Sequence, residues 1–337
     1  MAGGTLEVSV ALCTHNGERF IAEQLLSILN QSRLPREIVL SDDASTDATV
    51  AIAETTFATF AAAHSHAPVR LTVLRNGVAF GVTKNFEQAI LACRSDLVAL
   101  CDQDDVWMPH RLERLVGVFA ARPRLQLVHS DARLIDDSGE DLGETLFQAY
   151  EVTAELQKLI HSGAAFTVLM HRNVVTGATV VMRRELAAAA APFPANWVHD
   201  EWLAVVAATL GELDLVADQL IDYRQHGGNA IGARRLSFVG KFARMVEPGA
   251  KRNARLLARA TSLAERLREL GDLVPSERLA ATEHKLRHEE ARSELSVHRA
   301  ARVVPVLREL RTGRYGEFGR GVSDAVRDLL QPLGTSR

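Results

Sequence analysis

Residues 97–112 read LVALCDQDDVWMPHRL, an apolar run followed at once by a cluster of acidic residues. Residues 97–101 are a short apolar run, which is typical of a strand buried inside a parallel sheet. Asp102 and Asp104 follow this run directly, with Asp105 beside them. Two carboxylates one residue apart at a strand end can face one cavity if the chain turns there, and such hard oxygen ligands hold Mg²⁺ or Mn²⁺.

The chain before this stretch alternates between strand-like and helix-like segments. The expected strands are residues 6–12, 37–41, 69–74 and 96–101, and the expected helices are residues 18–30, 46–60 and 84–93. This alternation predicts βαβ units and a largely parallel sheet in an α/β fold. Ligands bind such sheets at the carboxyl ends of the strands, and polar residues gather there at 14–16, 42–43 and 102–105.

The last hundred residues have a different pattern. Leu256, Ala260, Leu263, Leu267 and Leu270 are spaced by four and three residues, which is a heptad-like seam. Residues 240–337 hold 20 Lys and Arg against 13 Asp and Glu, whereas the chain as a whole is slightly acidic, at −3. We expect a catalytic domain at residues 1–239 and an α-helical region at 240–337. The basic region either is a solvated face or contacts an anionic surface.

The composition excludes several classes of protein. The chain has 337 residues, of which 47% are hydrophobic, so it can bury a core and is not disordered as a whole. We find no apolar run of the roughly 18 residues that a membrane-spanning helix needs, and we expect no signal peptide. Cys13, Cys93 and Cys101 show no ligand-like spacing and suit a reducing compartment. We therefore expect a soluble, cytoplasmic protein.

Seven segments, in this order, resemble glycosyltransferase family 2, which is inverting and has the GT-A fold. They are VSVALCTHNG (8–17), LSDDASTDAT (40–49), NGVAFGVTKNFEQAI (76–90), LVALCDQDDVWMPHRL (97–112), VTGATVVMRREL (175–186), VHDEWLAVVAA (198–208) and YRQHGGNAIG (223–232). The resemblance covers about residues 6–235, and the DQDD-x-W, HDEW and YRQHGGN variants are most similar to rhamnosyltransferase-like members. Two departures are mild: Cys13-Thr14-His15 replaces the more usual Pro-Thr-Tyr, and Ser41-Asp42-Asp43-Ala44 replaces Val-Asp-Asp-Gly.

The resemblance implies roles for particular residues. The residues implied to bind the nucleotide sugar are Thr14, Asn16, Asp42, Asp43, Lys84, Asn85, Asp102 and Arg224. Those implied to hold a divalent metal, Mn²⁺ or Mg²⁺, are Asp102, Asp104 and His226. Asp200 occupies the place of the general base. Arg224 and His226 also lie where a basic segment closes over the diphosphate.

The role implied for Asp200 agrees with elementary chemistry. Inverting transfer needs one base to deprotonate the acceptor hydroxyl and a positive group to neutralise the departing nucleoside diphosphate. Asp200 precedes an apolar helix at residues 202–210, and a helix N-terminus favours the ionised carboxylate. The alternative is that Asp200 only caps this helix, a position that Asp often occupies. The same alternative holds for Asp42.

The resemblance predicts transfer of a single sugar, because the Gln-x-x-Arg-Trp motif of processive synthases is absent from the sequence. The expected donor is dTDP-rhamnose, with Trp107, Trp197 and Trp202 as candidate apolar walls. The expected acceptor is a glycan or lipid-linked glycan in bacterial surface polysaccharide synthesis. A UDP-hexose or UDP-N-acetylhexosamine donor is one alternative, and a non-catalytic sugar-nucleotide-binding or scaffold protein is another. We expect no nucleic acid partner. The C-terminal helices could add peripheral contact with the inner face of the cell membrane, or form a homo-oligomer.

Overall fold

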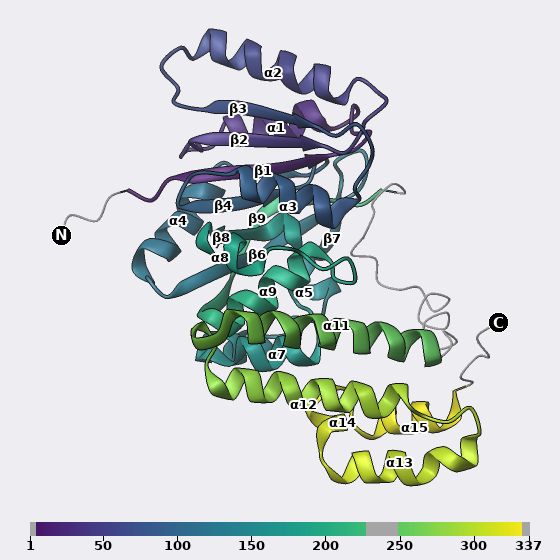
Figure 1. Ribbon diagram of the computed structural model, residues 1–337. Coiled ribbons are helices and arrows are strands. Elements are labelled where there is room, and N and C mark those ends of the chain that lie inside the picture. The colour runs from purple at the N-terminus through teal and green to yellow at the C-terminus, as the bar shows by residue number, and fades with distance from the viewer. Residues whose placement is uncertain (1–4, 227–248, 332–337) are drawn as a thin grey trace. The chain divides into compact units, whose positions relative to one another are not determined.

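The computed structural model describes residues 5–226 and 249–331 (Figure 1). They form two compact units, which we describe separately: residues 5–165 with 174–226, and residues 166–173 with 249–331. The sequence did not indicate that residues 166–173 group with the C-terminal helices. The predicted domain boundary between residues 239 and 240 lies outside the described residues and stays a prediction.

The first unit contains a nine-stranded sheet in the order β3-β2-β1-β4-β8-β6-β9-β5, with β7 paired to β6. The strands are β1 (Val8–Thr14), β2 (Glu37–Asp42), β3 (Arg70–Arg75), β4 (Leu97–Cys101), β5 (Val106–Trp107), β6 (Leu125–Ile135), β7 (Asp141–Thr145), β8 (Val180–Arg183) and β9 (Glu212–Arg224). The first four are mutually parallel, as predicted. Every residue of β1 and β4 is buried, which explains why β4 is an uninterrupted apolar run and why β1 is apolar except for Ser9 and Thr14.

Helices alternate with the first four strands, also as predicted. They are α1 (Ile21–Leu29), α2 (Thr49–Ala63), α3 (Val82–Ala92) and α4 (Arg111–Ala121). In α1 the residues that repeat at helical spacing, Ile21, Leu25 and Ile28, are fully buried in the core with β1 and β2 residues. These helices cover the sheet, and the carboxyl ends of its four parallel strands, β1 to β4, lie at the same edge.

The second half of the first unit is mixed, and its strands were not predicted. Strand β8 runs antiparallel to β4 and β6, whereas β6 and β9 are parallel. The helical segments here are α5 (Leu146–Ala149), α6 (Ala154–Leu159), η1 (Ile160–Ala164), η2 (Gly177–Thr179), α8 (Glu185–Ala190) and α9 (His199–Leu210). Helix α9 is buried on nearly all sides from Trp202 to Thr209, which matches its apolar sequence.

The second unit is helical, as predicted for residues 240–337. It comprises α7 (Ala165–His171), α11 (Gly249–Leu270), η3 (Gly271–Leu273), α12 (Ser276–Ser293), α13 (Arg299–Arg311), α14 (Arg314–Phe318) and α15 (Val322–Leu330). Pro305 lies inside α13. None of the described helices combines the length and the apolarity that crossing a bilayer requires.

Part of the heptad-like seam of α11 packs inside the second unit. Ala260, a seam residue, is buried in one cluster with Ala264 and with Leu286 of α12, and Leu257 packs against the same cluster. The homo-oligomer stays a prediction.

Candidate active site

The candidate site lies where β1, β2 and β4 end. Thr14 and Asp42 are paired residues in the register of β1 and β2, and Asp102 follows the last residue of β4. Adjacent parallel strands put their carboxyl ends side by side, so three polar loops meet at this edge. The sequence-predicted site residues Thr14, Asp42 and Asp102 are therefore brought together.

Asp42 holds the turn that follows β2. Its carboxylate accepts hydrogen bonds from Thr14 Oγ1 at 2.8 Å, from Ser45 Oγ at 2.5 Å and from the Ser45 N–H at 2.9 Å. It is buried at the end of its strand. Asp42 thus holds this turn, and it does not cap α2, whose N-cap is Ala48. Asn16 supports the same turn, because its Oδ1 accepts from the Thr46 N–H at 2.9 Å.

Asp43 holds the loop between β3 and α3. It accepts hydrogen bonds from the N–H groups of Phe80 (2.7 Å) and Gly81 (2.8 Å). On α3, Asn85 is buried and bonds to Ser41 of β2 through both its amide oxygen and its amide nitrogen. These residues fix the shape of the loops around the strand ends.

Lys84 lies apart from these buried contacts. Its Nζ is 2.5 Å from Glu87 Oε2, and its side chain is 41% exposed. Together with Phe80, Gln88 and Leu91, these two residues line an open hollow of about 460 Å³. Lys84 keeps a solvent-accessible positive charge on the first turn of α3.

Gln103 joins the loops after β1 and β4, a role that the sequence did not suggest. Its Oε1 accepts from the His15 N–H at 2.8 Å, and its Nε2 donates to the His15 carbonyl oxygen at 3.1 Å. The Gln103 amide passes over Gly17, where a Cβ atom would stand 2.2 Å from Oε1. Gly17 is therefore required for this close approach. The reciprocal pair fixes the segment that carries Asp102 and Asp104.

Asp102 has an unusual electrostatic environment. Desolvation by burial, followed by the negative charges of Asp104 and Asp200, raises the pKa of Asp102 to about 8. The same causes, with Asp104 and Asp102 as the neighbours, raise the pKa of Asp105. Asp200 comes from α9, about a hundred residues further along the chain, yet it lies near enough to act on Asp102. The fold thus gathers carboxylates from two segments, as predicted.

Residues at the end of β9 secure the Asp104 segment. Asp104 Oδ2 lies 2.7 Å from His226 Nε2, and the Asp104 carbonyl oxygen accepts from Arg224 Nε at 2.8 Å. The Arg224 guanidinium is buried and also donates to Glu23 at 2.7 Å. The role at the diphosphate that the resemblance implies for Arg224 stays a prediction, and in the structure the side chain bonds to protein oxygens. The part of the YRQHGGNAIG segment after His226 lies outside the described residues.

Asp200 is the second residue of α9, and it is not the N-cap, which is Val198. Its Oδ2 accepts from the Gly177 N–H at 2.9 Å, so the η2 turn orients the carboxylate. Next to it, His199 is buried and stacked on Phe86, with ring centroids 3.9 Å apart. Burial lowers the pKa of His199 to about 3, so the ring is neutral. Gly177 and His199 are site residues that the sequence analysis missed.

The donors at this edge suit a hard divalent cation. Asp102 and Asp104 offer carboxylate oxygens, and burial together with the charges of Asp104 and Asp200 raises the pKa of Asp102, which a bound divalent cation would lower. Among the described residues, no three His, Cys, Asp or Glu side chains already form a metal cluster. The residues present therefore fit a metal that has few protein ligands and takes the rest from a bound diphosphate.

The sequence is similar to those of known glycosyltransferases. The model of the family described as glycosyl transferase family 2 matches residues 9–188. An uncharacterised glycosyltransferase of Nostoc sp. is 25% identical over 228 residues, or 66% of each protein. The dTDP-rhamnosyl transferase RfbG of Shigella flexneri is 32% identical over 109 residues, covering 31% of this chain and 35% of RfbG. The chain thus matches about two thirds or less of the length of these relatives.

Two solved structures share the fold. TarS residues 1–349 of S. aureus, in complex with UDP-GlcNAc, superposes with a TM-score of 0.55 and 17% identity, covering 85% of this chain and 72% of TarS 1–349. The mannosyltransferase PcManGT of Pyrobaculum calidifontis, in complex with GDP-Man and Mn²⁺, gives a TM-score of 0.51 and 19% identity, covering 92% and 76%. The fold is therefore GT-A, with additional C-terminal helices.

Proposed function

The chain belongs to glycosyl transferase family 2, and from this membership we propose that it transfers one sugar from a nucleotide-diphosphate sugar to a hydroxyl group of a glycan or lipid-linked glycan. The reaction inverts the anomeric carbon. One observation carries the proposal: Asp102 and Asp104, which follow β4, and Asp200 of α9 come from two distant segments and interact electrostatically at the edge where β4 ends. Grouping partly desolvated carboxylates lowers the stability of the folded protein, and such groups are concentrated at functional sites.

Asp200 is the proposed general base. In a single displacement, the acceptor hydroxyl attacks the anomeric carbon and loses its proton, and the bond to the diphosphate breaks. A carboxylate that is held by the Gly177 N–H and lies in the first turn of α9 is favoured in its ionised form. An ionised, oriented carboxylate is what removal of that proton requires.

Asp102 and Asp104 are the proposed holders of Mn²⁺ or Mg²⁺, with His226 beside them. When bound, such a cation neutralises charge on the departing nucleoside diphosphate. The chain's own contribution is to fix Asp104 through His226 and through the buried Arg224. We therefore assign Arg224 a positioning role at this loop.

The proposed nucleotide pocket is formed by the loops after β1 and β2 and by the start of α3. Thr14, Asp42, Asp43 and Asn85 hold these loops through internal hydrogen bonds. Two of the predicted residues keep exposed side chains at this edge, Asn16 and Lys84, and we propose that these contact the nucleotide sugar directly.

The proposed donor is dTDP-rhamnose. Support comes from the DQDD-x-W and HDEW variants and from the partial similarity to RfbG. Of the three tryptophans predicted to form an apolar wall for the sugar, Trp202 and Trp107 are buried in the core and Trp197 is partly exposed. Trp197 is therefore the one we propose as a contact for the sugar. A 6-deoxy sugar presents a methyl group where a hexose has a hydroxyl, so an indole ring is a suitable contact. A UDP-hexose or UDP-N-acetylhexosamine donor stays the alternative.

The test is a donor screen on the full chain. Thermal unfolding is followed with dTDP-rhamnose, dTDP-glucose, UDP-glucose or UDP-N-acetylglucosamine, each with and without Mn²⁺, because a bound ligand raises the unfolding midpoint. Donors that bind are then assayed for sugar release and for transfer to one glycan acceptor. We expect dTDP-rhamnose to give the highest kcat/KM. A UDP-sugar preferred by about tenfold would refute the rhamnose assignment and leave sugar transfer intact.

The same screen separates an enzyme from a scaffold protein. A protein that only binds sugar nucleotides would be stabilised by a donor but would neither release nor transfer its sugar, and this result would contradict the proposed activity. We place the reaction in the cytoplasm, where nucleotide sugars are made, at the inner face of the cell membrane when the acceptor is lipid-linked.

A further inference from the structure

Helices α13 and α15 expose aliphatic side chains in stripes. On α13 these are Val303, Val304 and Leu307, and on α15 they are Val322, Val326 and Leu330, between 44% and 65% exposed. The α15 positions are four residues apart, so they lie along one side of the helix. The two helices pack against each other in the second unit. A monomeric protein rarely leaves such a cluster of aliphatic groups in water without a use for it.

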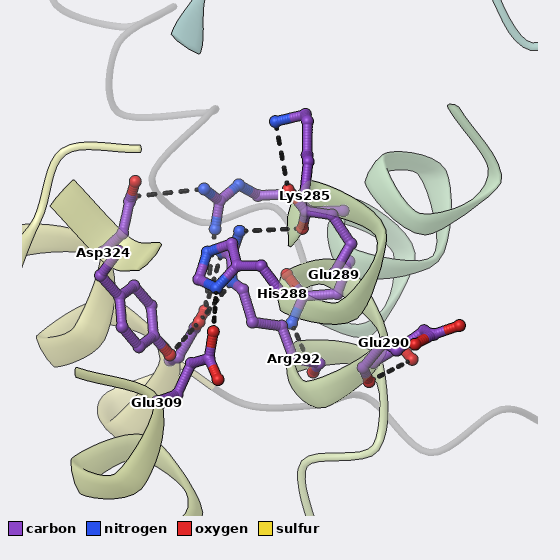
Figure 2. A network of polar contacts seen from close by, with 12 residues as sticks. Lys285, His288, Glu289, Glu290, Arg292, Glu309 and Asp324 are labelled. Atoms are coloured by element: carbon purple, nitrogen blue, oxygen red, sulfur yellow. Dashed lines mark hydrogen bonds and ion pairs between the residues drawn. The ribbon is translucent and has the colours of Figure 1, made fainter. Parts of the chain in front are cut away.

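Most acidic residues at positions 299–331, which include α13, α14 and α15, are buried. Three of the four carboxylates in residues 299–331, namely Glu309, Asp324 and Asp328, are buried. They take part in a polar network with basic side chains of α11 and α12, in which Figure 2 labels Glu309 and Asp324. The pairs are Glu309 with His288 (2.6 Å), Asp328 with Arg292 (2.7 Å) and Asp324 with Arg252 (3.3 Å). Tyr315 also donates to Asp328, at 2.9 Å.

Most of the basic residues at 299–331 are at least partly exposed, whereas Arg302 is buried and donates to backbone carbonyl oxygens. Arg299, Arg308, Arg311 and Arg320 are exposed, and Arg314 and Arg327 are partly exposed. Within the described residues 299–331, Glu317 is the one exposed carboxylate. Most acids of this region are therefore buried in ion pairs, whereas most of its arginines are exposed beside the aliphatic stripes.

We propose that α13, α14 and α15 form a docking surface for a bilayer that contains anionic lipids. Aliphatic stripes flanked by arginines are the features by which helices lie in the lipid headgroup region. The arginines are attracted to anionic headgroups, and their long side chains reach the phosphates while the aliphatic groups enter the acyl boundary. Duplex nucleic acid would satisfy the arginines but would leave the valines and leucines in water. The surface thus fits a lipid membrane better than another polyanion.

The proposal is independent of sugar transfer, because no residue of the candidate active site belongs to it. It sharpens the sequence-based expectation of membrane contact from the whole basic region to α13–α15. It also predicts that two kinds of side chain, charged and aliphatic, contribute together.

The experiment is flotation of the full chain with vesicles of phosphatidylcholine alone or mixed with phosphatidylglycerol, at about 0.05 M and about 0.5 M salt. We expect binding to the anionic vesicles at low salt and weaker binding at high salt, since the Debye length shortens from about 14 Å to about 4 Å. Arg308→Gln with Arg311→Gln should lower the partition coefficient roughly 30-fold, or about fivefold per arginine. Val304→Ser with Val326→Ser should lower it roughly tenfold.

Matched controls lie on the first unit. Arg70→Gln with Arg94→Gln removes the same charge, and Leu142→Ser alters an exposed aliphatic residue of β7. Neither control should change flotation. The proposal is wrong if no binding to anionic vesicles occurs at low salt, or if the controls weaken binding as much as the test variants. If only the arginine pair matters and duplex DNA binds as tightly as vesicles, the surface is a general polyanion site and the lipid assignment is overturned.

Discussion

Asp104 is the residue whose environment fits a metal ligand best. One carboxylate oxygen lies beside His226, and its backbone is fixed by Arg224, so the other oxygen is presented by a rigid loop. Asp104→Asn removes the charge but keeps the shape. We expect sugar transfer to be nearly abolished and the Mn²⁺-dependent rise of the unfolding midpoint with nucleotide to disappear.

The control for Asp104 is Asp218→Asn, which changes an exposed carboxylate paired with Arg114. This variant should leave transfer and the metal response unchanged, because exposed ion pairs contribute little. Full activity of Asp104→Asn in metal-free buffer would show that the metal assignment is wrong.

Asp200 is expected to act in a different way, on turnover and not on donor binding. Asp200→Asn keeps an oxygen that can accept from the Gly177 N–H, so the start of α9 should stay in place. We expect kcat to fall by about 10² to 10⁴ and the donor Kd to stay the same. Glu201→Gln, on the next residue, is the control and should have little effect. If donor binding and turnover fall equally, Asp200 has a structural role.

At the scale of elements, the η2 turn and the first turn of α9 must approach closely. A Cβ atom on Gly177 would stand 2.7 Å from His199 Nε2 and 3.5 Å from Asp200 Cβ. His199 cannot withdraw, because it is buried and stacked on Phe86. Gly177→Ala should therefore displace Asp200, lower kcat by about tenfold or more, and lower the free energy of unfolding by about 1–3 kcal/mol.

Gly117 of α4 offers a matched control, since nothing lies within 4 Å of the Cβ that an alanine would add. Gly117→Ala should leave kcat unchanged and raise the free energy of unfolding by about 0.5–1 kcal/mol, as expected inside a helix. Steady-state kinetics and urea unfolding measure both effects. A fully active, equally stable Gly177→Ala variant would contradict the proposed packing.

The elements that the sequence predicted are those whose evidence is local. Strands β1 to β4 are short segments rich in Val, Leu and Ile between turn residues, and helix α1 shows its buried positions at helical spacing. Strand β9 was missed because acidic residues interrupt its apolar pattern. Asp214 and Asp222 there pair with Arg122 and with Arg133 of β6, which are about ninety residues away in the chain. Pairing between residues so far apart in the chain cannot be recognised in any short stretch of the sequence.

The same reason limits what could be predicted of the candidate site. Asp102 and Asp104 follow an apolar strand, so their place at the sheet edge could be inferred from position alone. The bridge from Gln103 to His15 joins residues 88 apart, and it depends on Gly17 having no side chain. The commitment of the Arg224 side chain to the protein depends on Glu23, two hundred residues earlier. Such contacts follow from the assembled fold.

At the scale of the whole molecule, the acidic cluster should make stability depend on pH. The pKa of Asp102 is about 8 in the folded protein, against 3.8 ordinarily. Between these values the folded protein keeps a proton that the unfolded chain has released. The folded state then binds more protons, so the contribution of Asp102 to the free energy of unfolding falls as the pH rises from about 4 to about 8.

Asp102→Asn isolates this contribution, because asparagine has the shape of the carboxyl group but cannot ionise. Without metal, the stability gap between variant and wild type should widen in favour of the variant with rising pH, by several kcal/mol and at most about 6 kcal/mol between about pH 4 and about pH 8. When Mn²⁺ and nucleotide are added at neutral pH, the wild type should become more stable than Asp102→Asn, since only the wild type keeps the charged ligand. Urea unfolding at a series of pH values measures the gap, with Asp218→Asn as the control. A gap that stays constant across this range would mean that Asp102 titrates normally and that the carboxylates do not act as a cluster.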